Sequence, residues 1–261
     1  MDSGSANGRI TVELDARGVA IITIDRRARL NALTKKLMGE FVAALDALAA
    51  DPALRVAVLT GAGGKAFVGG ADIKEMAALD ADSARAFITL VHQTCDAVRR
   101  LPVPVIGRLE GYALGAGLEL AAACDLRIVS PHSKFAMPEV RLGIPSVVEA
   151  ALLPRLVGAS RARMLVYTGR TIDAQTAHAW GLVDEIAADL DAAVGRCVDE
   201  MLEAGPHALR AQKQLAKMWE ELPLAEAIER SIEVFAASWG SDEPARLMQR
   251  YLQERQRAKA R

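Results

Sequence analysis

The start of the chain changes from a strand-like to a helix-like pattern of apolar side chains. Residues 10–14 alternate between apolar and polar, residues 15–18 form a polar turn that ends in glycine, and residues 19–24 are apolar again, which predicts a β-hairpin. From Leu33 to Leu48 the apolar residues recur at three- and four-residue spacing, which predicts an amphipathic helix. The chain therefore begins with two strands and a helix.

Strand and helix patterns then alternate. Residues 56–60 are a short apolar run of the buried-strand type, closed by the glycine-rich residues 61–64. A strand, a loop and a helix follow in the same order over residues 103–124, and a further strand is predicted at residues 126–130. This alternation indicates an α/β fold.

The strand patterns stop at about residue 201. Residues 208–219, 224–239 and 244–257 are amphipathic over helical lengths, which predicts three helices with polar faces. We therefore divide the chain into a core of residues 1–200, which includes the N-terminal hairpin, and a helical region of residues 201–261.

Composition narrows the functional classes. The chain has 261 residues, of which 51% are hydrophobic and 25% charged, and its net charge is −1. This length predicts one or two domains, and the near-zero charge supplies no field that would gather nucleic acid or an anionic membrane surface. Because no apolar run is long enough to span a bilayer, we expect a water-soluble protein with neither nucleic acid nor membrane among its partners.

The cysteines and the first residues bear on the cellular compartment. Cys95, Cys124 and Cys197 are far apart and odd in number, so we expect buried thiols without disulfides, as in the reducing cytoplasm. Residues 1–8 are small and polar, with neither an apolar core nor an arginine-rich pattern. We therefore expect a flexible tail there, and not a secretory signal or a transit peptide.

Two glutamates are candidate acids. Glu119 and Glu139 each lie near a glycine in an apolar stretch. A carboxylate in apolar surroundings loses hydration and its pKa rises, so two such groups can serve as an acid and a base near neutral pH. By itself, Glu119 could be present because its negative charge suits the positive end of the helix dipole. The helix that follows has almost no polar face, however, and should bury this glutamate. Glu139 could instead be a surface residue or an ion-pair partner of Arg141.

A candidate anion site precedes these acids. Residues 65–76 have the sequence K-A-F-V-G-G-A-D-I-K-E-M, a glycine loop that leads into a helix start. The first N–H groups of a helix have no partner within the helix, so they can hold an anion. An acid, a base and an anion-binding loop are then all present.

The remaining motifs disfavour other chemistry. Residues 61–66 fit the outline G-x-G-x-x-A, but no helix starts directly after them, which argues against a dinucleotide site. The chain has neither a G-x-S-x-G elbow nor a cysteine in the context of a thiolate nucleophile. The histidines lack metal-ligand spacing, so we predict no metal site and interpret them as structural or exposed: His92, His132, His178 and His207.

Three segments together resemble a known family. The loop G-G-A-D-I-K-E-M, the helix start G-Y-A-L-G-A-G-L-E-L and the segment P-E-V-R-L-G-I-P occur in the order and at the rough intervals of the enoyl-CoA hydratase/isomerase family, also called the crotonase family. The resemblance covers most of the chain, from Asn31 to the carboxyl tail. It implies a spiral of strand-strand-helix turns and a C-terminal helical region that packs between subunits, commonly in a homotrimer or a dimer of trimers.

The resemblance also implies roles for residues of the glycine loop and the next helix. The N–H groups of Ala71 and Ala116 would form an oxyanion hole for the oxygen of an acyl-CoA thioester, and Asp72, Ile73 and Lys74 would join them in binding the substrate. Alanine at position 116 replaces the usual glycine, which is a mild departure because a donor N–H needs only a negative φ there.

The acids acquire roles from the same resemblance. Glu119 would activate a water against the β-carbon of a 2-enoyl-CoA, and Glu139 would deliver a proton to the α-carbon. This predicts an enoyl-CoA hydratase without a cofactor, because coenzyme A is part of the substrate.

Residues 145–155 lack the glycine-rich stretch of typical hydratases and carry an extra acid, Glu149, which leaves the acyl-chain preference open. Glu149 could also be a plain solvated residue near a helix start.

Other functions remain open. The family also hosts enoyl-CoA isomerases, hydroxyacyl-CoA dehydratases and thioester hydrolases, among which the fold alone does not decide. Isomerases can manage with one carboxylate, so the presence of both Glu119 and Glu139 favours hydration. A non-catalytic acyl-CoA-binding or RNA-binding protein ranks last, since only 4% of the residues are aromatic and the charge is near balance.

The residues that would bind the phosphates of coenzyme A stay open. The candidates are Arg26, Arg27, Arg29 and the basic tail.

Overall fold

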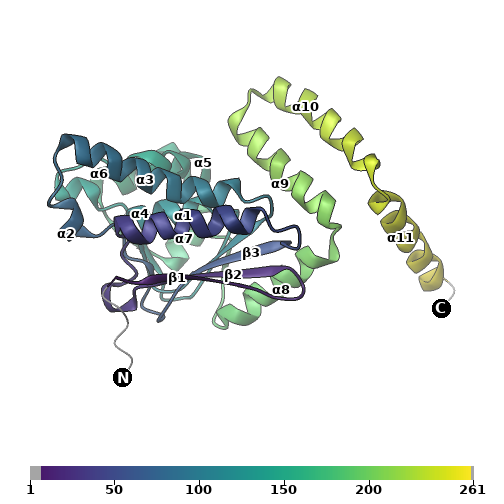
Figure 1. Cartoon of the computed structure of the whole chain (residues 1–261), viewed down its shortest axis with the longest axis horizontal. Coiled ribbons are helices and arrows are strands. Elements are labelled where there is room, and N and C mark those ends of the chain that lie inside the picture. The colour runs from purple at the N-terminus through teal and green to yellow at the C-terminus, as the bar shows by residue number, and fades with distance from the viewer. Residues whose placement is uncertain (1–6, 260–261) are drawn as a thin grey trace. The chain divides into compact units, whose positions relative to one another are not determined.

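The computed structural model describes residues 7–259 and divides the chain into two compact units (Figure 1). The first unit extends to Cys197 and the second begins at Val198. Most of the tail predicted at residues 1–8 lies outside the described residues. Among the residues that are described, no helix is both long and apolar enough to cross a membrane.

The elements follow the predicted alternation. The strands are β1 Arg9–Leu14, β2 Val19–Asp25, β3 Val56–Gly61, β4 Ala66–Val68, β5 Val105–Leu109, β6 Tyr112–Leu114, β7 Leu126–Val129, β8 Lys134–Ala136, β9 Thr171–Asp173 and β10 Glu185–Ile186. The α-helices are α1 Lys35–Ala49, α2 Ile73–Met76, α3 Ala81–Arg100, α4 Ala116–Ala123, α5 Leu153–Val157, α6 Ala159–Thr168, α7 Ala174–Trp180, α8 Leu190–Glu203, α9 Pro206–Glu221, α10 Leu224–Ala237 and α11 Glu243–Lys259. Short 3-10 helices are η1 Arg27–Arg29, η2 Glu139–Leu142, η3 Val148–Leu152 and η4 Ser238–Gly240.

Two sheets are built from strands that follow each other in pairs. The larger sheet has the order β1-β2-β3-β5-β7-β10 and is parallel apart from the β1–β2 hairpin. The smaller sheet has the order β4-β6-β8-β9, with β9 antiparallel. The pairs β3 and β4, β5 and β6, and β7 and β8 each give one strand to each sheet before a helix follows. This confirms the predicted α/β fold with strand-strand-helix turns.

The core lies between the larger sheet and its covering helices. All six residues of β3 are buried, and α1 and α3 pack against each other and carry buried apolar side chains such as Phe41 and Phe87 (Figure 1). Helix α1 begins two residues after the predicted Leu33 because the hydroxyl of Thr34 accepts a hydrogen bond from the N–H of Leu37 and caps the helix. Apolar periodicity locates the helix, and the cap sets its first residue.

The cysteine prediction is wrong at one position. Cys95 and Cys124 are buried, as expected, but Cys197 is partly exposed. The buried residues of α8 include Val194 and Val198, and Cys197 lies beside them in the sequence. Its position on the helix therefore leaves part of the thiol in solvent.

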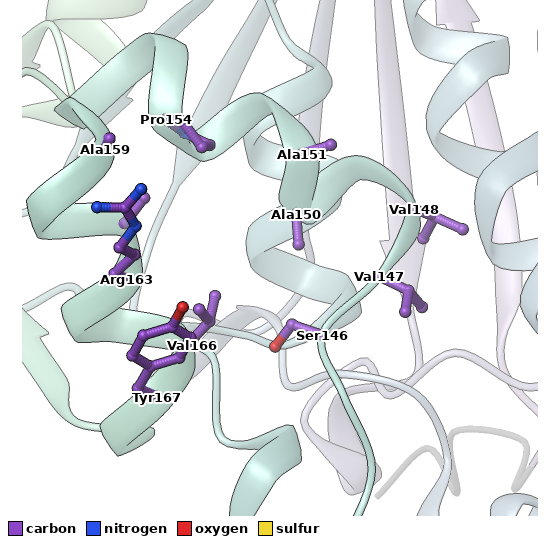
Figure 2. A pocket seen from close by; sticks show the side chains of 11 residues that line it. Ser146, Val147, Val148, Ala150, Ala151, Pro154, Ala159, Arg163, Val166 and Tyr167 are labelled. Atoms are coloured by element: carbon purple, nitrogen blue, oxygen red, sulfur yellow. The ribbon is translucent and has the colours of Figure 1, made fainter.

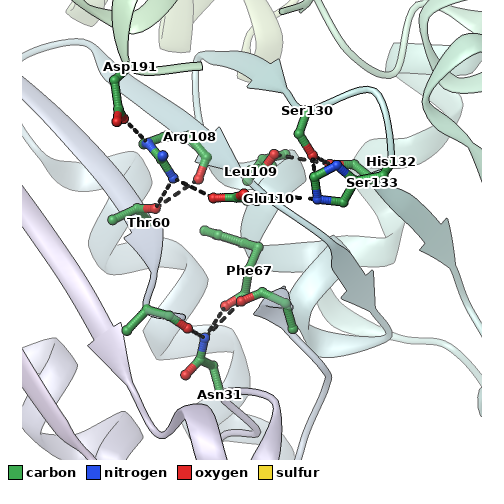
Figure 3. Close-up of polar contacts among 12 residues, drawn as sticks. Asn31, Thr60, Phe67, Arg108, Leu109, Glu110, Ser130, His132, Ser133 and Asp191 are labelled. Atoms are coloured by element: carbon green, nitrogen blue, oxygen red, sulfur yellow. Dashed lines mark hydrogen bonds and ion pairs between the residues drawn. The ribbon is translucent and has the colours of Figure 1, made fainter. Parts of the chain in front are cut away.

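Asn31 connects the first helix region to the glycine loop of the smaller sheet (Figure 3). Its side chain is fully buried, and its amide nitrogen donates to the carbonyl oxygens of Ala62, Ala66 and Phe67 at 3.0, 2.8 and 3.2 Å. Its side-chain oxygen accepts the N–H of Arg26 at 2.8 Å. These bonds fix a left-handed backbone, with φ of 56°, that asparagine tolerates better than most residues.

A second polar cluster lies at the ends of the parallel strands (Figure 3). Arg108 of β5 donates to Asp191 at 2.6 Å and lies 3.3 Å from Glu110. The carbonyl of Arg108 accepts the hydroxyl of Thr60 on β3 at 3.1 Å. This cluster connects β3, β5 and α8 within the first unit.

Besides the end of α8, the second unit contains α9, α10 and α11, which match the helices predicted for residues 208–219, 224–239 and 244–257. Glu243 at the start of α11 is 4% exposed and accepts the N–H groups of His207 and Ala208 at 3.2 and 2.9 Å, so it caps α9 from a distance in sequence. One face of α10 carries exposed apolar side chains at Leu224, Ile228, Ile232 and Phe235, at helical spacing.

We expect Asn31→Ala to lower the free energy of unfolding by about 2–4 kcal/mol, since it leaves buried carbonyls and a buried N–H without their partner. Urea denaturation of the purified protein measures this. Gln93→Ala, at an exposed position of α3, is the control and should change the free energy by less than about 0.5 kcal/mol. A loss for Asn31→Ala that matches the control would contradict the role given to this side chain.

Candidate active site

The predicted site residues lie just beyond the carboxyl ends of three neighbouring strands in the smaller sheet. Val68 of β4 pairs with Ala113 of β6. Ala71 and Ala116 each follow their paired residue by three positions, 68 to 71 and 113 to 116. Because parallel strands end at the same edge of a sheet, the two alanines emerge close to each other, at the edge where α/β sheets bind ligands.

Glycines make this close approach possible. A Cβ atom on Gly117 would lie 2.0 Å from the carbonyl oxygen of Val68, so the first turn of α4 packs directly on the backbone at the end of β4. A Cβ atom on Gly70 would lie 3.1 Å from the carbonyl oxygen of Leu114, and the φ of Gly70 is 109°. Larger residues at 70 and 117 would push the loop that holds Ala71 away from the start of α4.

The N–H groups of Ala71 and Ala116 are available as donors. Leu33 pairs with this loop through the carbonyl of Gly70 and the N–H of Asp72, which leaves the N–H of Ala71 outside the bridge. Ala116 is the first residue of α4, so its N–H has no acceptor within the helix. Within residues 7–259 neither N–H donates a hydrogen bond. The oxyanion hole predicted for this pair of alanines stays a prediction, and the local backbone is compatible with it.

Glu119 is buried in the first turn of α4, as its apolar helix predicted. All eight residues of α4 are buried and Glu119 is 4% exposed. Its Oε1 accepts the N–H of Ala150 at 3.2 Å. Burial, together with the charges of Glu139 and Glu149, raises the pKa of Glu119 to about 8 against the opposing effect of the Ala150 N–H. A carboxyl with this pKa can exchange a proton near neutral pH.

Glu139 lies at the start of η2 and reaches the start of α4. A Cβ atom on Gly115, the residue before α4, would lie 2.2 Å from the Oε1 of Glu139, and the φ of Gly115 is 52°. The hydroxyl of Ser146 donates to the Oε2 of Glu139 at 2.8 Å. Arg141 donates to the carbonyl of Thr168, and no ion pair joins it to Glu139 in the described part of the chain. The structure therefore brings Glu139 next to the helix that carries Glu119.

The side chains that follow Ala71 differ in their contacts and in their exposure to solvent. Asp72 caps α2 by accepting the N–H groups of Lys74 and Glu75, and it forms an ion pair with Arg26 at 2.7 Å. Burial pushes the pKa of Asp72 up, but these hydrogen bonds outweigh it and the pKa lies below its usual value. The carboxyl of Asp72 and the guanidinium of Arg26 are thus already engaged, whereas Ile73 is 63% exposed and Lys74 is exposed as well. Their substrate roles stay predictions.

A cavity of about 440 Å³ is lined in part by Ser146 (Figure 2). Ser146 and Val147 line one side of it, and Arg163, Val166 and Tyr167 of α6 line another. Since the Ser146 hydroxyl donates to Glu139, one lining residue of the cavity contacts the candidate acid. Its size and mostly apolar wall are typical of small-molecule sites.

Two residues at this site received no role in the chemistry of the two acids from the sequence. Glu149 is 7% exposed, which contradicts its interpretation as a solvated residue, because η3 turns its side chain toward α3 and not toward solvent. The Oε1 of Glu149 lies 2.7 Å from the Nδ1 of His92, which was interpreted only as structural or exposed. The apolar run around Glu149 could have predicted its burial, but nothing in the sequence predicts its contact with His92. Among residues 7–259 no group of His, Cys, Asp and Glu side chains could hold a metal ion.

Comparison with known proteins agrees with this architecture. Residues 15–259 match the Enoyl-CoA hydratase/isomerase family. The chain is similar to the crotonyl-CoA hydratase of Syntrophomonas wolfei, with 35% identity over 91% of this chain and 92% of the relative. It is also similar to the mitochondrial methylglutaconyl-CoA hydratase of Mus musculus, with 34% identity over 82% of this chain and 70% of the relative.

Solved structures resemble the whole chain. A crystal structure of an enoyl-CoA hydratase from Mycobacterium smegmatis superposes with a TM-score of 0.90 at 28% identity, and covers 94% of this chain and 96% of that one. The enoyl-CoA hydratase of Bacillus anthracis superposes with a TM-score of 0.89 at 30% identity, with the same coverage. Because both superpositions cover 94% of this chain, the agreement in fold includes the predicted helical region.

We expect Glu119→Gln to raise the melting temperature more at about pH 8.5 than at about pH 5.5. The folded-state pKa of Glu119, about 8, lies above the ordinary carboxyl value of 4.5. The wild-type protein therefore loses stability as the pH rises from about 4.5 to about 8, and glutamine has no proton to lose. Calorimetry at the two pH values measures the difference. Glu13→Gln, on the exposed side of β1, is the control, and an equal shift at both pH values for Glu119→Gln would contradict the buried-acid interpretation.

Proposed function

Since the chain belongs to the enoyl-CoA hydratase/isomerase family, we propose that it is an enoyl-CoA hydratase that adds water across the 2,3 double bond of an acyl-CoA thioester. The observation that carries the proposal is the meeting of Glu119, Glu139 and the start of α4 at one edge of the smaller sheet. The names of the two relatives above, both hydratases of acyl-CoA esters, support the same reaction class.

The thioester oxygen binds between the N–H groups of Ala71 and Ala116. When hydroxide adds to the β-carbon, electrons of the double bond move toward the thioester and negative charge grows on its oxygen. Two donors placed for that charge stabilise the transition state by about 2.7–4 kcal/mol each. The unused N–H groups and the glycine-dependent approach of the two segments support this role.

The two acids move the protons. Glu119 accepts a proton from the attacking water while the oxygen bonds to the β-carbon, and Glu139 gives a proton to the α-carbon. The net change adds H and OH to the double bond, and a proton passes back from Glu119 to Glu139 before the next turnover. The raised pKa of Glu119 makes its carboxylate a stronger proton acceptor than an ordinary carboxylate, which supports its role as the base. This scheme needs no metal or redox cofactor.

The rest of the substrate binds around these groups. The cavity beside Ser146 accepts the acyl chain, and the side chains of Val147 and Val148 narrow it, so we propose a short or slender acyl group. Ile73 and Lys74 are exposed next to Ala71, where the coenzyme A part of the bound substrate would extend out of the site. The exposed apolar face of α10 supports assembly into a homotrimer or a dimer of trimers.

Isomerisation, dehydration of a specialised hydroxyacyl-CoA and thioester hydrolysis use the same oxyanion hole. Isomerisation needs one carboxyl, and the closeness of Glu139 to the helix of Glu119 favours a reaction that needs two. Hydration is therefore the function that this geometry supports best.

We expect Glu119→Gln and Glu139→Gln each to lower the turnover of crotonyl-CoA hydration by about 10²–10⁴ while acyl-CoA still binds. The loss of double-bond absorbance measures the rate, and isothermal titration with a saturated acyl-CoA measures binding. Asp82→Asn, on an exposed turn of α3, is the control and should leave both unchanged. Near wild-type hydration by both glutamate variants would refute the proposed roles.

We expect kcat/KM for hydration to fall above about pH 8. Glu119 and Glu139 must share one proton, which Glu139 gives to the α-carbon, and above this pH the shared proton is lost from Glu119. The reverse reaction, followed with a 3-hydroxyacyl-CoA, should fall over the same range, since both directions use the same singly protonated pair. Circular dichroism at each pH separates this effect from unfolding. A rate that stays constant to about pH 9.5 would count against it.

A further inference from the structure

A third carboxyl, from Glu149, lies behind Glu119. Its Oε1 is held by His92 on α3, and its Oε2 is buried without a hydrogen-bond partner among the residues that the structure describes. A buried polar atom without a partner destabilises a fold. Burial raises the pKa of Glu149, although the bond from His92 opposes this. Such a group is worth testing for a role in the chemistry next to it.

The backbone at this point is also strained. Val148, directly before Glu149, has a φ of 42°. A β-branched residue rarely adopts this left-handed conformation, and the surrounding contacts must hold it there. The bond between Glu149 and His92 is one such contact, since it fixes η3 to α3.

The same 3-10 helix holds Glu119. The N–H of Ala150, the residue after Glu149, donates to the Oε1 of Glu119 at 3.2 Å. A chain of contacts therefore runs from His92 on α3 through Glu149 and Ala150 of η3 to Glu119 on α4. The charge of Glu149 also contributes to the raised pKa of Glu119, after the larger effects of burial and Glu139.

Ionisable groups on three neighbouring helices lie around η3. Helix α3 supplies His92, Cys95 and Arg99, helix α4 supplies Glu119, and α5 carries the exposed Arg155. Burial raises the pKa of the Cys95 thiol well above its usual value, so it stays neutral. His92, with a side chain 53% exposed, connects Glu149 to the solvent-facing side of α3.

We propose that Glu149, held by His92, is a positioning residue for Glu119: it anchors the Ala150 N–H that binds Glu119 and places a like charge behind it. The proposal rests on the hydratase function, in which Glu119 takes a proton from water. A negative charge nearby makes Glu119 hold that proton more tightly, and the Ala150 N–H has the opposite effect. The balance of the two sets the pH range in which the pair of acids keeps its one proton.

The test is the pH profile of kcat/KM for the hydration of crotonyl-CoA. Glu149→Gln keeps the size of the side chain and removes its charge, so we expect the falling limb of the profile to move to lower pH by about 0.5–1 unit. A merely structural role would lower the rate by the same factor at every pH. Gln93→Ala, the exposed neighbour of His92, is the matched control and should leave the limb in place.

An unmoved limb in a folded Glu149→Gln variant would overturn the proposal. If this variant does not fold, His92→Ala replaces it, because His92 is half exposed. Its loss loosens η3 and weakens the Ala150 bond to Glu119, so the limb should move to higher pH, and an unmoved limb would overturn the proposal equally. Failure of the hydratase function itself has a different signature, an active Glu119→Gln variant or no hydration by the wild-type protein.

Discussion

The first turn of α4 packs on the backbone of β4, and this contact requires glycine at position 117. Any larger residue would bring a Cβ atom to 2.0 Å from the carbonyl oxygen of Val68, well inside the contact distance of the two atoms. The same packing brings the N–H of Ala116 toward the loop that carries Ala71, and it fixes the direction in which Glu119 enters the core. One backbone contact thus determines where both the candidate oxyanion donors and the candidate base lie.

Burial of Glu119 is the energetic cost of this arrangement. An ionised carboxyl in an apolar helix loses its hydration, and the Ala150 N–H restores only part of it. The protein responds by keeping the proton on Glu119 up to about pH 8, so the group is neutral over the range in which most proteins are most stable. In the proposed reaction Glu119 acts as the base, so this proton must first move to Glu139, which gives it to the α-carbon. Stability and chemistry therefore act on the same equilibrium.

Local patterns in the sequence predicted the elements but not their contacts. The hairpin, α1, β3 and the C-terminal helices have the period expected of them, and the cap at Thr34 explains why α1 begins later than its apolar pattern. The burial of Glu119 followed from the composition of α4 alone. The place of Glu139 did not, because it depends on the pairing of Leu114 with Ala136 between β6 and β8, which no local pattern encodes. A 3-10 helix of four residues, such as η2, also has too little period to be recognised.

Glu149 shows where such prediction ends. Its partner His92 is 57 residues away in the chain, so only the packing of η3 against α3 reveals that the two side chains meet. Once Glu149 is known to be buried, the site contains more acid than its two predicted members, and like charges that lie close together cannot all ionise at neutral pH. The enclosure thereby favours a state in which at least one carboxyl remains protonated. A reaction that must deliver a proton to carbon from a carboxylic acid requires such a state, and the crowding of acids around α4 supplies it.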